Sequence, residues 1–424
     1  MDLTHGGEVL AESYAEKGDE VTAVDVYHNC LPAARAILLS RGIRVLDSTP
    51  REGFDVAVSP IHCPDRFLQG AVFERRLTHH QAVGELAHFN YPVIEVTGAV
   101  AKTSSCHILA HILRAQGRKT LVLTSSGLLS VGETVEVLEE KASITPATIL
   151  RISKMRGDWD FGIFECSLGG TGLADIGVVT NMTEEYQIAG GTRSSNEGKM
   201  QMVRSARHKI VIAAEDESIV EDEIADGTEL TTFGSGGDVQ VTVLKDLRLG
   251  ESAPSILRVG QRNIPFSLSG RFIAPSYSRG LSAAAALAYA AGVEADDIAK
   301  ALGSFEGVPG RGEVNRRDGL IVIRERNPGV TARSIDWNLS SLEEYYHAAD
   351  VALVVDPLNV KVCEKLDIDD IAAVVRQRKS LKAAYVVDRG LKKELPPPLI
   401  KISKAEDVLG AHSVTLWCTK EGYL

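Results

Sequence analysis

A lysine and three hydroxyl side chains, in the stretch Lys102-Thr103-Ser104-Ser105, are the neighbours in this chain with the clearest chemical potential. They follow a β-branched run, residues 93–97, and precede a run with apolar residues at helical spacing. In such a strand-turn-helix, backbone N–H groups and the positive helix end bind phosphate oxygens. The lysine ammonium then reaches the outer phosphates and the threonine hydroxyl binds Mg2+. The stretch therefore predicts a nucleotide-phosphate site.

The glycine pattern of a phosphate loop is incomplete here. Ala101 stands where G-x-x-x-x-G-K-[ST] has the glycine before the lysine, and Val96 stands at its first glycine. An ordinary strand-to-helix turn with a solvent-facing lysine is therefore a competing interpretation of the same residues.

Polar residues end two predicted strands downstream of this turn. A strand over 160–165 ends at Glu165, and a strand over 176–181 ends at Asn181. Parallel sheets bind ligands beyond the carboxyl ends of their strands, so these side chains could hold the magnesium of a nucleotide. An isolated acid at a strand end is usually a simple cap, so the prediction depends on the neighbouring Lys102.

Length and composition limit the possible classes of protein. The 424 residues predict two to three domains of an ordinary globular chain, with 44% hydrophobic and 24% charged residues. A net charge of -11 and the lack of a basic run argue against nucleic-acid binding. The six cysteines form no C-x-x-C pair, and the apolar run 281–293 is too short to cross a bilayer. Without a signal peptide either, we expect a cytoplasmic protein with no membrane partner.

The first segment, residues 1–91, alternates predicted strands and helices. Strands are expected over 2–4, 21–27, 43–46 and 55–59, and helices over 8–17 and 31–41, closed by Gly18 and Gly42. This alternation predicts a parallel, doubly wound sheet whose strand-end turns bind substrate. The candidate substrate residues in these turns are His5, Gly6, Gly7, His28 and His62.

Other roles remain open for these histidines, each of which could cap a turn or face water. A G-x-G-x-x-G fingerprint is absent, so a nicotinamide cofactor is not expected. His79, His80 and His88 are expected on one helix, where no further ligand has the spacing of a metal site.

Strands also alternate with helices in the other two segments, 92–316 and 317–424. Further strands are expected over 119–124, 208–213, 320–324, 351–355, 384–387 and 414–418. The three segments, 1–91, 92–316 and 317–424, are predicted to be separate α/β domains.

Several motifs resemble those of the Mur ligase family, ATP-dependent ligases that include the muramyl peptide ligases and folylpolyglutamate synthase. Residues 97–104, T-G-A-V-A-K-T-S, are similar to the family's T-G-x-x-G-K-[ST] turn. Residues 180–186, T-N-M-T-E-E-Y, are similar to its T-N-x-x-x-D-H segment. Residues 305–313, F-E-G-V-P-G-R-G-E, are similar to F-x-G-x-x-x-R-x-E, whose arginine contacts the nucleotide. The order of these motifs covers the chain from about Val93 to the C-terminus.

The resemblance implies a fold, a reaction and a set of site residues. The implied fold is α/β, with Rossmann-like N- and C-terminal domains around a central P-loop ATPase domain. The implied cofactors are ATP and Mg2+, and the implied chemistry is activation of a substrate carboxylate as an acyl phosphate. The implied catalytic residues are Lys102, Glu165, Lys199 and Asn181, with Lys199 near the family's carbamylated lysine. The implied nucleotide contacts are Thr97, Gly98, Ala101, Lys102, Thr103, Ser104 and Arg311, and the implied metal ligands are Thr103 and Glu165.

The chain departs from the family pattern at Ala101, at Tyr186, which replaces a metal-binding histidine, and in 270–276, which lacks an asparagine pair. The openings D-L-T-H-G-G and V-T-A-V-D-V-Y resemble a branch that closes a carbocyclic ring on a nickel tetrapyrrole acid. For such a carboxylate-rich small-molecule substrate, suitable partners would be Arg35, Arg66, Arg75 and Arg76. An amino-acid ligase and a regulatory nucleotide-binding protein are the alternatives, and we expect a monomer or a homodimer.

Overall fold

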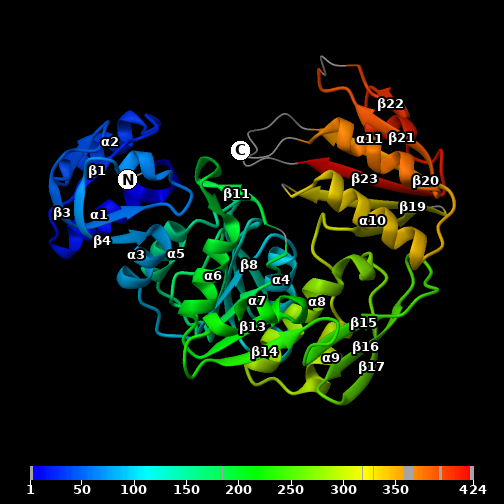
Figure 1. The fold of residues 1–424 in the computed structure, drawn as a ribbon. Helices are drawn as coiled ribbons and strands as arrows, with labels where there is room; N and C mark the ends of the chain where they lie inside the picture. The colour runs from blue at the N-terminus through cyan, green and yellow to red at the C-terminus, as the bar shows by residue number, and fades with distance from the viewer. Residues whose placement is uncertain are drawn as a thin grey trace. The chain divides into compact units, whose positions relative to one another are not determined.

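A computed structural model of the chain describes residues 3–183, 185–317, 319–327, 329–357, 366–390 and 394–420. The motif positions Asp2, Glu184 and Pro328 lie outside these ranges. The chain divides into two compact units, whose helices and strands are labelled in Figure 1. Unit 1 holds residues 1–240 and 282–294, and unit 2 holds residues 241–281 and 295–424. Within the described ranges, none of the helices has the length and apolar character needed to span a bilayer.

The centre of unit 1 is a sheet of parallel strands in the order β14-β13-β10-β5-β9-β6. These strands are β5 (Val93–Thr97), β6 (Thr120–Thr124), β9 (Phe161–Glu165), β10 (Ile176–Val179), β13 (Lys209–Ala213) and β14 (Glu229–Phe233). Antiparallel β7 (Gly127–Val131) and β8 (Val135–Glu140) extend it beyond β6. Because β5 lies between β9 and β10, the residues that follow these three strands meet at one edge of the sheet.

Helices of unit 1 cover this sheet. They are α3 (His79–Leu86), α4 (Lys102–Ala115), α5 (Pro146–Ser153), α6 (Ser195–Ser205), α7 (Glu217–Val220) and, from residue 282 on, α8 (Ser278–Ala290). The apolar positions Ile108, Leu109, Ile112 and Leu113 of α4 are buried, which confirms the helical spacing seen in the sequence. The strands expected over 160–165, 176–181 and 208–213 form with shifts of one or two residues at their ends.

The first segment of the chain differs most from expectation. The strand expected over 2–4 is wrong, because Leu3–Gly7 forms an irregular helical turn that leads into α1 (Glu8–Lys17). The remaining elements are β1 (Thr22–Val24), α2 (Pro32–Ser40), β2 (Arg44–Leu46), β3 (Gly53–Ser59) and β4 (Val72–Thr78). They form two separate two-stranded parallel sheets, β1-β2 and β3-β4, instead of one continuous sheet. The strand β4 was not expected, since its sequence VFERRLT carries three charged residues.

Two residue placements in this segment also change. His5 lies in the helical turn before α1 and not at the end of a strand, so its predicted position is corrected. His88 lies two residues beyond the end of α3, while His79 and His80 begin that helix. A capping box at Thr78 and Gln81 starts α3 at this point.

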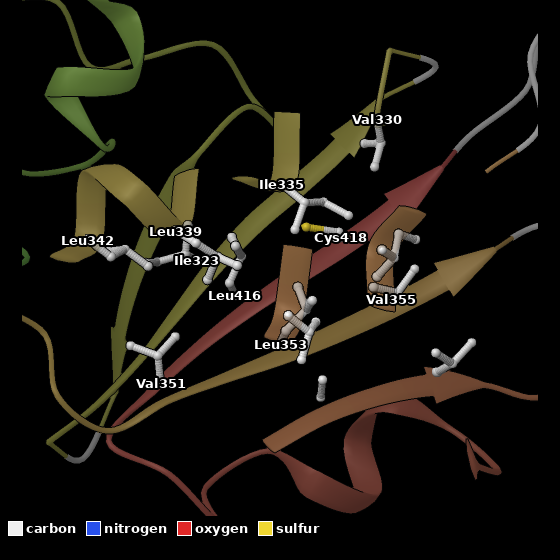
Figure 2. Close-up of a cluster of buried hydrophobic side chains, with 14 of the residues drawn as sticks. Ile323, Val330, Ile335, Leu339, Leu342, Val351, Leu353, Val355, Leu416 and Cys418 are labelled. Carbon is white, nitrogen blue, oxygen red and sulfur yellow. The ribbon is translucent and has the colours of Figure 1, made fainter. Parts of the chain in front are cut away.

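Unit 2 contains a second sheet, in the order β18-β19-β23-β20-β21-β22. Its strands are β18 (Glu313–Arg317), β19 (Leu320–Asn327), β20 (Val351–Pro357), β21 (Leu381–Val387), β22 (Leu399–Ile402) and β23 (Val414–Lys420). All neighbours are parallel except β18 and β19. Figure 2 shows side chains of β19, β20 and β23 packing against Ile335, Leu339 and Leu342 of α10 (Ala332–Glu344). The predicted alternation of strands and helices is confirmed here.

The remaining helices and strands of both units are as follows. Unit 2 also contains α9 (Ala295–Gly303), α11 (Ile368–Gln377) and the antiparallel pair β16 (Ala253–Val259) and β17 (Arg262–Leu268). The strand β15 (Val239–Val243) spans the boundary in sequence between the two units, and β11 (Gln187–Ile188) pairs with β12 (Arg193–Ser194) in unit 1.

Candidate functional site

The turn between β5 and α4 has the conformation that its sequence predicted. Gly98 has φ +136°, and a Cβ atom at this position would lie 2.0 Å from Thr180 Oγ1. The Thr180 hydroxyl donates to Val100 O at 2.6 Å, and Thr180 N donates to Thr97 O. Gly98 is therefore required both for its backbone angle and for the close approach of β10.

Ala101 has a left-handed backbone conformation. Its φ is +63° and its ψ is 1°, directly before the first residue of α4. An L-residue in this region costs about 1–2 kcal/mol. The turn therefore places an alanine where a glycine would be free of strain.

Replacing Ala101 with glycine is expected to stabilise unit 1. The relief of about 1–2 kcal/mol of strain exceeds the roughly 0.4–1 kcal/mol by which glycine favours the unfolded chain. We expect a net gain of about 0.5–1 kcal/mol, measured from the midpoint of urea-induced unfolding. Ala147→Gly in α5, at a position with ordinary helical geometry, is the control and should lower the midpoint. A lower midpoint for Ala101→Gly would contradict the strain at this position.

Lys102 folds back over the turn. Its Nζ donates to Gly98 O at 2.9 Å and approaches Ala99 O at 3.5 Å. The hydroxyl groups of Ser104 and Ser105 both donate to Ala101 O. The ammonium is therefore held at the mouth of the turn, next to the first turn of α4.

Glu165 and Thr103 meet beside this lysine. Thr103 Oγ1 donates to Glu165 Oε2 at 2.8 Å, and Ser125 N donates to the same oxygen at 3.1 Å. Glu165 and Thr103 are both buried. The predicted pairing of a strand-end acid with the Lys-Thr turn is thus present in the structure.

Asn181 completes the turn from the neighbouring strand. Its Oδ1 accepts from Ala99 N at 2.8 Å and from Val100 N at 3.3 Å. Its buried Nδ2 has no hydrogen-bond partner within the described part of the chain. A buried donor of this kind is costly unless a ligand or water accepts from it, so Asn181 is suited to contact a phosphate oxygen.

Lys199 lies buried in α6, close to the loop that follows Glu165. A Cβ atom at the preceding Gly198 would lie 2.0 Å from Leu168 O, so α6 and this loop touch backbone to backbone. In the same loop, Gly169 N donates to Thr97 Oγ1 at 3.2 Å. The loop after Glu165 therefore contacts both Thr97 and α6, the helix that carries Lys199.

His80 was not expected to take part in this arrangement. Its Nε2–H donates to Ser167 O at 2.7 Å, two residues after Glu165, which assigns the neutral tautomer with the proton on Nε2. Burial lowers the pKa of His80 from 6.5 to about 4; the bond to Ser167 opposes this shift and the charge of His62 adds to it. Nothing in the sequence around His79 and His80 indicated that His80 would be buried.

Stability should fall as the pH drops from about 6.5 to about 4, because the unfolded chain binds a proton at His80 before the folded chain does. The shift corresponds to roughly 3 kcal/mol of unfolding free energy over this window. His80→Leu should flatten this part of the profile in urea unfolding measured at a series of pH values. Substitution of the exposed His28 is the control. An unchanged profile in His80→Leu would contradict the assignment.

Two of the candidate substrate histidines are brought together. The rings of His5 and His62 lie 4.6 Å apart between centroids in an edge-to-face arrangement. His5 and Gly6 also line a cavity of about 200 Å3 with Thr145, Thr148 and Arg151. Gly7 precedes α1, and His28 is exposed after β1 with φ +54°.

The remaining predicted residues lie apart from this turn or in unit 2. Tyr186 is 49% exposed in the loop before α6. Arg311 belongs to unit 2, where the Tyr277 hydroxyl donates to its carbonyl oxygen. Desolvation raises the pKa of Glu325, and the charge of Arg311 acts in the opposite direction. Of the arginines considered for a substrate, three pair with carboxylates of the first segment: Arg35 with Asp47, Arg75 with Glu85 and Arg76 with Asp65.

The residues at the turn are compatible with a nucleotide-bound Mg2+. Within the described ranges, no three histidine, cysteine or acidic side chains are grouped as metal ligands. A magnesium ion on a nucleotide needs only one or two protein oxygens, since phosphates and water supply the rest. Both hydrogen bonds to Glu165 reach Oε2, so Oε1 has no protein donor in the described structure and could bind a cation.

The sequence resembles those of a known synthetase and a known ligase. No family model matches the chain. It is 29% identical over 399 residues to a coenzyme F(430) synthetase of Methanosarcina acetivorans, covering 86% of this chain and 84% of the relative. It is 28% identical over 243 residues to a UDP-N-acetylmuramoyl-L-alanyl-D-glutamate–2,6-diaminopimelate ligase of Bacillus velezensis, covering 52% of this chain and 48% of that one.

Solved structures give the fold. A crystal structure of MurF from Acinetobacter baumannii matches with a TM-score of 0.61 at 15% identity, over 95% of this chain and 87% of that one. MurF ligase from Thermotoga maritima in complex with ADP matches with a TM-score of 0.58 at 15% identity, over 88% of this chain and 92% of that one. The chain therefore has the fold of the Mur ligases, and its sequence resembles that of a coenzyme F(430) synthetase.

Proposed function

We propose that this enzyme uses ATP to activate a carboxylate of its substrate as an acyl phosphate. A carboxylate oxygen attacks the γ-phosphorus of ATP, the bond to the bridging oxygen breaks, and ADP leaves with the electron pair. A nucleophile then attacks the acyl carbon, loses its proton and expels inorganic phosphate. The observation that carries the proposal is the meeting of Lys102, Thr103 and Glu165 at one turn.

Each residue at the turn has a proposed role. The Lys102 ammonium, now bonded to Gly98 O, would exchange this weak acceptor for the outer phosphates of ATP and stabilise their charge. Asn181 would hold the turn through Ala99 N and donate Nδ2 to a phosphate oxygen. Further contacts are proposed for Thr97, Gly98, Ala101, Ser104 and Arg311, which the family resemblance assigns to the nucleotide.

Thr103 and Glu165 would hold the Mg2+ of the nucleotide. The ion supplies charge neutralisation on the phosphate oxygens when it is bound. Carbamylation of Lys199, proposed from the family resemblance, would turn a buried ammonium into a carboxylate-like group at the same sheet edge. The three domains, 1–91, 92–316 and 317–424, also remain a proposal.

The proposed substrate is a nickel tetrapyrrole carboxylic acid, and the proposed nucleophile is a carbon of the same molecule, which closes a carbocyclic ring. The product would be coenzyme F430. The similarity to a coenzyme F(430) synthetase over 86% of the chain supports this choice. A second candidate, an amide ligase that adds an amino acid to a carboxylate, is favoured by the similarity to the diaminopimelate ligase.

Phosphate release distinguishes the two candidates. Purified protein is mixed with Mg-ATP and a nickel tetrapyrrole acid, with and without amino acids, and phosphate and the tetrapyrrole absorption spectrum are followed together. We expect phosphate release and a spectral change without any added amine. Turnover that requires an amino acid would replace ring closure with amide formation. No phosphate release with any acid would overturn the ligase proposal itself.

A further inference from the structure

Two arginines from separate segments of unit 1 converge on one carboxylate. Arg76 of β4 donates to Asp65 Oδ1 at 2.8 Å, and Arg193 of β12 donates to the same oxygen at 2.6 Å. We call this group of three residues the Asp65 bridge. The Asp65 side chain is 64% exposed, while those of Arg76 and Arg193 are only 27% and 19% exposed. The carboxylate is thus the accessible member of the group, and the guanidinium groups lie beneath it.

Both guanidinium groups have a second anchor. Arg76 Nη2 donates to Ser59 Oγ at 3.4 Å, and Arg193 Nη1 donates to Ile61 O at 3.4 Å. Neither arginine therefore depends on Asp65 alone for its orientation. A different carboxylate could replace that of Asp65 and meet two donors that are already in place.

The bridge lies next to the candidate substrate histidines. Asp65 and His62 share the loop that follows β3, and the His62 ring packs on His5. His5 in turn lines the cavity of about 200 Å3. Two guanidinium groups and two imidazole rings therefore gather around one loop in a chain whose net charge is -11. This local excess of hydrogen-bond donors suits an anionic ligand.

We propose that Arg76 and Arg193 form a binding site for a carboxylate of the substrate that does not react, and that Asp65 occupies this site until the substrate displaces it. The inference rests on the proposed function, in which the substrate is a tetrapyrrole with several acetate and propionate side chains. A guanidinium group binds such a side chain in the same fork geometry that it uses for aspartate. The site would orient the tetrapyrrole while another of its carboxylates is activated.

A purely structural ion pair predicts different results from a carboxylate site. If the Asp65 bridge only joins the loop after β3 to β12, loss of the Asp65 charge and loss of an arginine should disturb the loop in the same way. If Asp65 competes with the substrate, removal of its charge should strengthen binding, while loss of an arginine should weaken it. The sign of the Asp65 effect therefore separates the two interpretations.

The test measures binding of uroporphyrin, a tetrapyrrole with acetate and propionate side chains, to the full-length protein without ATP, by porphyrin fluorescence. Arg193→Gln and Arg76→Gln should each weaken binding about tenfold, the loss expected for a hydrogen bond between charged groups. Asp65→Asn should strengthen binding several-fold. Arg193→Lys, which keeps the charge but not the fork, should fall between Arg193→Gln and the wild type.

An exposed ion pair of the same segment provides matched controls. Arg44 of β2 pairs with Glu52, and both side chains are more than a third exposed. Arg44→Gln and Glu52→Gln should leave porphyrin binding unchanged. Weaker binding in Asp65→Asn, or equal losses in the Arg44 and Arg193 variants, would overturn the inference, as would a wild-type protein that does not bind uroporphyrin.

The failure of the proposed function gives a separate result. Porphyrin binding with the expected signs, but no phosphate release from Mg-ATP with any tetrapyrrole acid, would leave the carboxylate site standing and remove the ligase reaction. If Arg193→Gln changes neither the rate nor the KM of phosphate release, the ligase reaction stands and the carboxylate site is removed. The unfolding midpoint of each variant is measured alongside, and Asp65→Asn decides the question even if an arginine variant does not fold.

Discussion

Lys102→Met is expected to reduce ATP-dependent phosphate release by about a hundred- to a thousandfold, the effect of removing one preorganised contact to a transition state. The methionine keeps the apolar stem but loses the ammonium that now lies at the mouth of the turn, bonded to Gly98 O. Charge spreads over the phosphoryl oxygens as the group transfers, so the loss should fall mainly on kcat. The measurement is phosphate release with the acid that supports wild-type turnover.

A second lysine of unit 1 serves as the control for this variant. Lys154 is half exposed and pairs with Glu16 at 2.8 Å, away from the turn. Lys154→Met should keep the wild-type rate, because Lys154 lies outside the turn. It should also keep the fold, because an exposed ion pair contributes little to stability. A Lys102→Met enzyme with the wild-type kcat would remove the phosphate role of the turn and with it the ligase proposal.

The local features of the site were predictable because short stretches of sequence determine them. One strand-turn-helix contains the buried run 93–97, Gly98 and the Lys102-Thr103 pair. The spacing of apolar residues changes within it from the strand period of two to the helical period of 3.6 residues. Glu165 ends β9 and Asn181 follows β10, the two strands that flank β5, so the parallel sheet brings them to the same edge. Such placement follows from strand order alone.

The features that were missed depend on contacts between distant residues. His80 and Ser167 are 87 residues apart, and Asp65 and Arg193 are 128 residues apart. Neither contact has a pattern within its own segment. The prediction for the first segment was partly wrong for a related reason. Alternating strands and helices do not show how many strands join one sheet, and here the strands pair only two by two. The left-handed geometry of Ala101 was also hidden, since alanine gives no sequence signal for it.

Glu165→Gln should separate metal binding from the structure of the turn. A glutamine side chain keeps the length of Glu165, and its carbonyl oxygen can still accept from Thr103 Oγ1 and Ser125 N. The fold of the loop should therefore survive, while the negative charge that would face a cation is lost. We expect the unfolding midpoint to change little and the Mg2+ concentration for half-maximal activity to rise about tenfold or more.

Titration of activity with Mg2+ measures this effect, with phosphate release as the signal. At saturating Mg2+ the rate should remain about a hundredfold below the wild type. A neutral amide holds the cation less well than a carboxylate does, so the cation stabilises the charge of the transferring phosphoryl group less. Glu139→Gln, which breaks only the exposed pair with Arg151, should leave the Mg2+ dependence unchanged. A side chain that binds Mg2+ must bind it more weakly once its negative charge is lost. If Glu165→Gln lowers the rate without shifting its Mg2+ dependence, Glu165 therefore supports the turn through Thr103 and does not bind the metal.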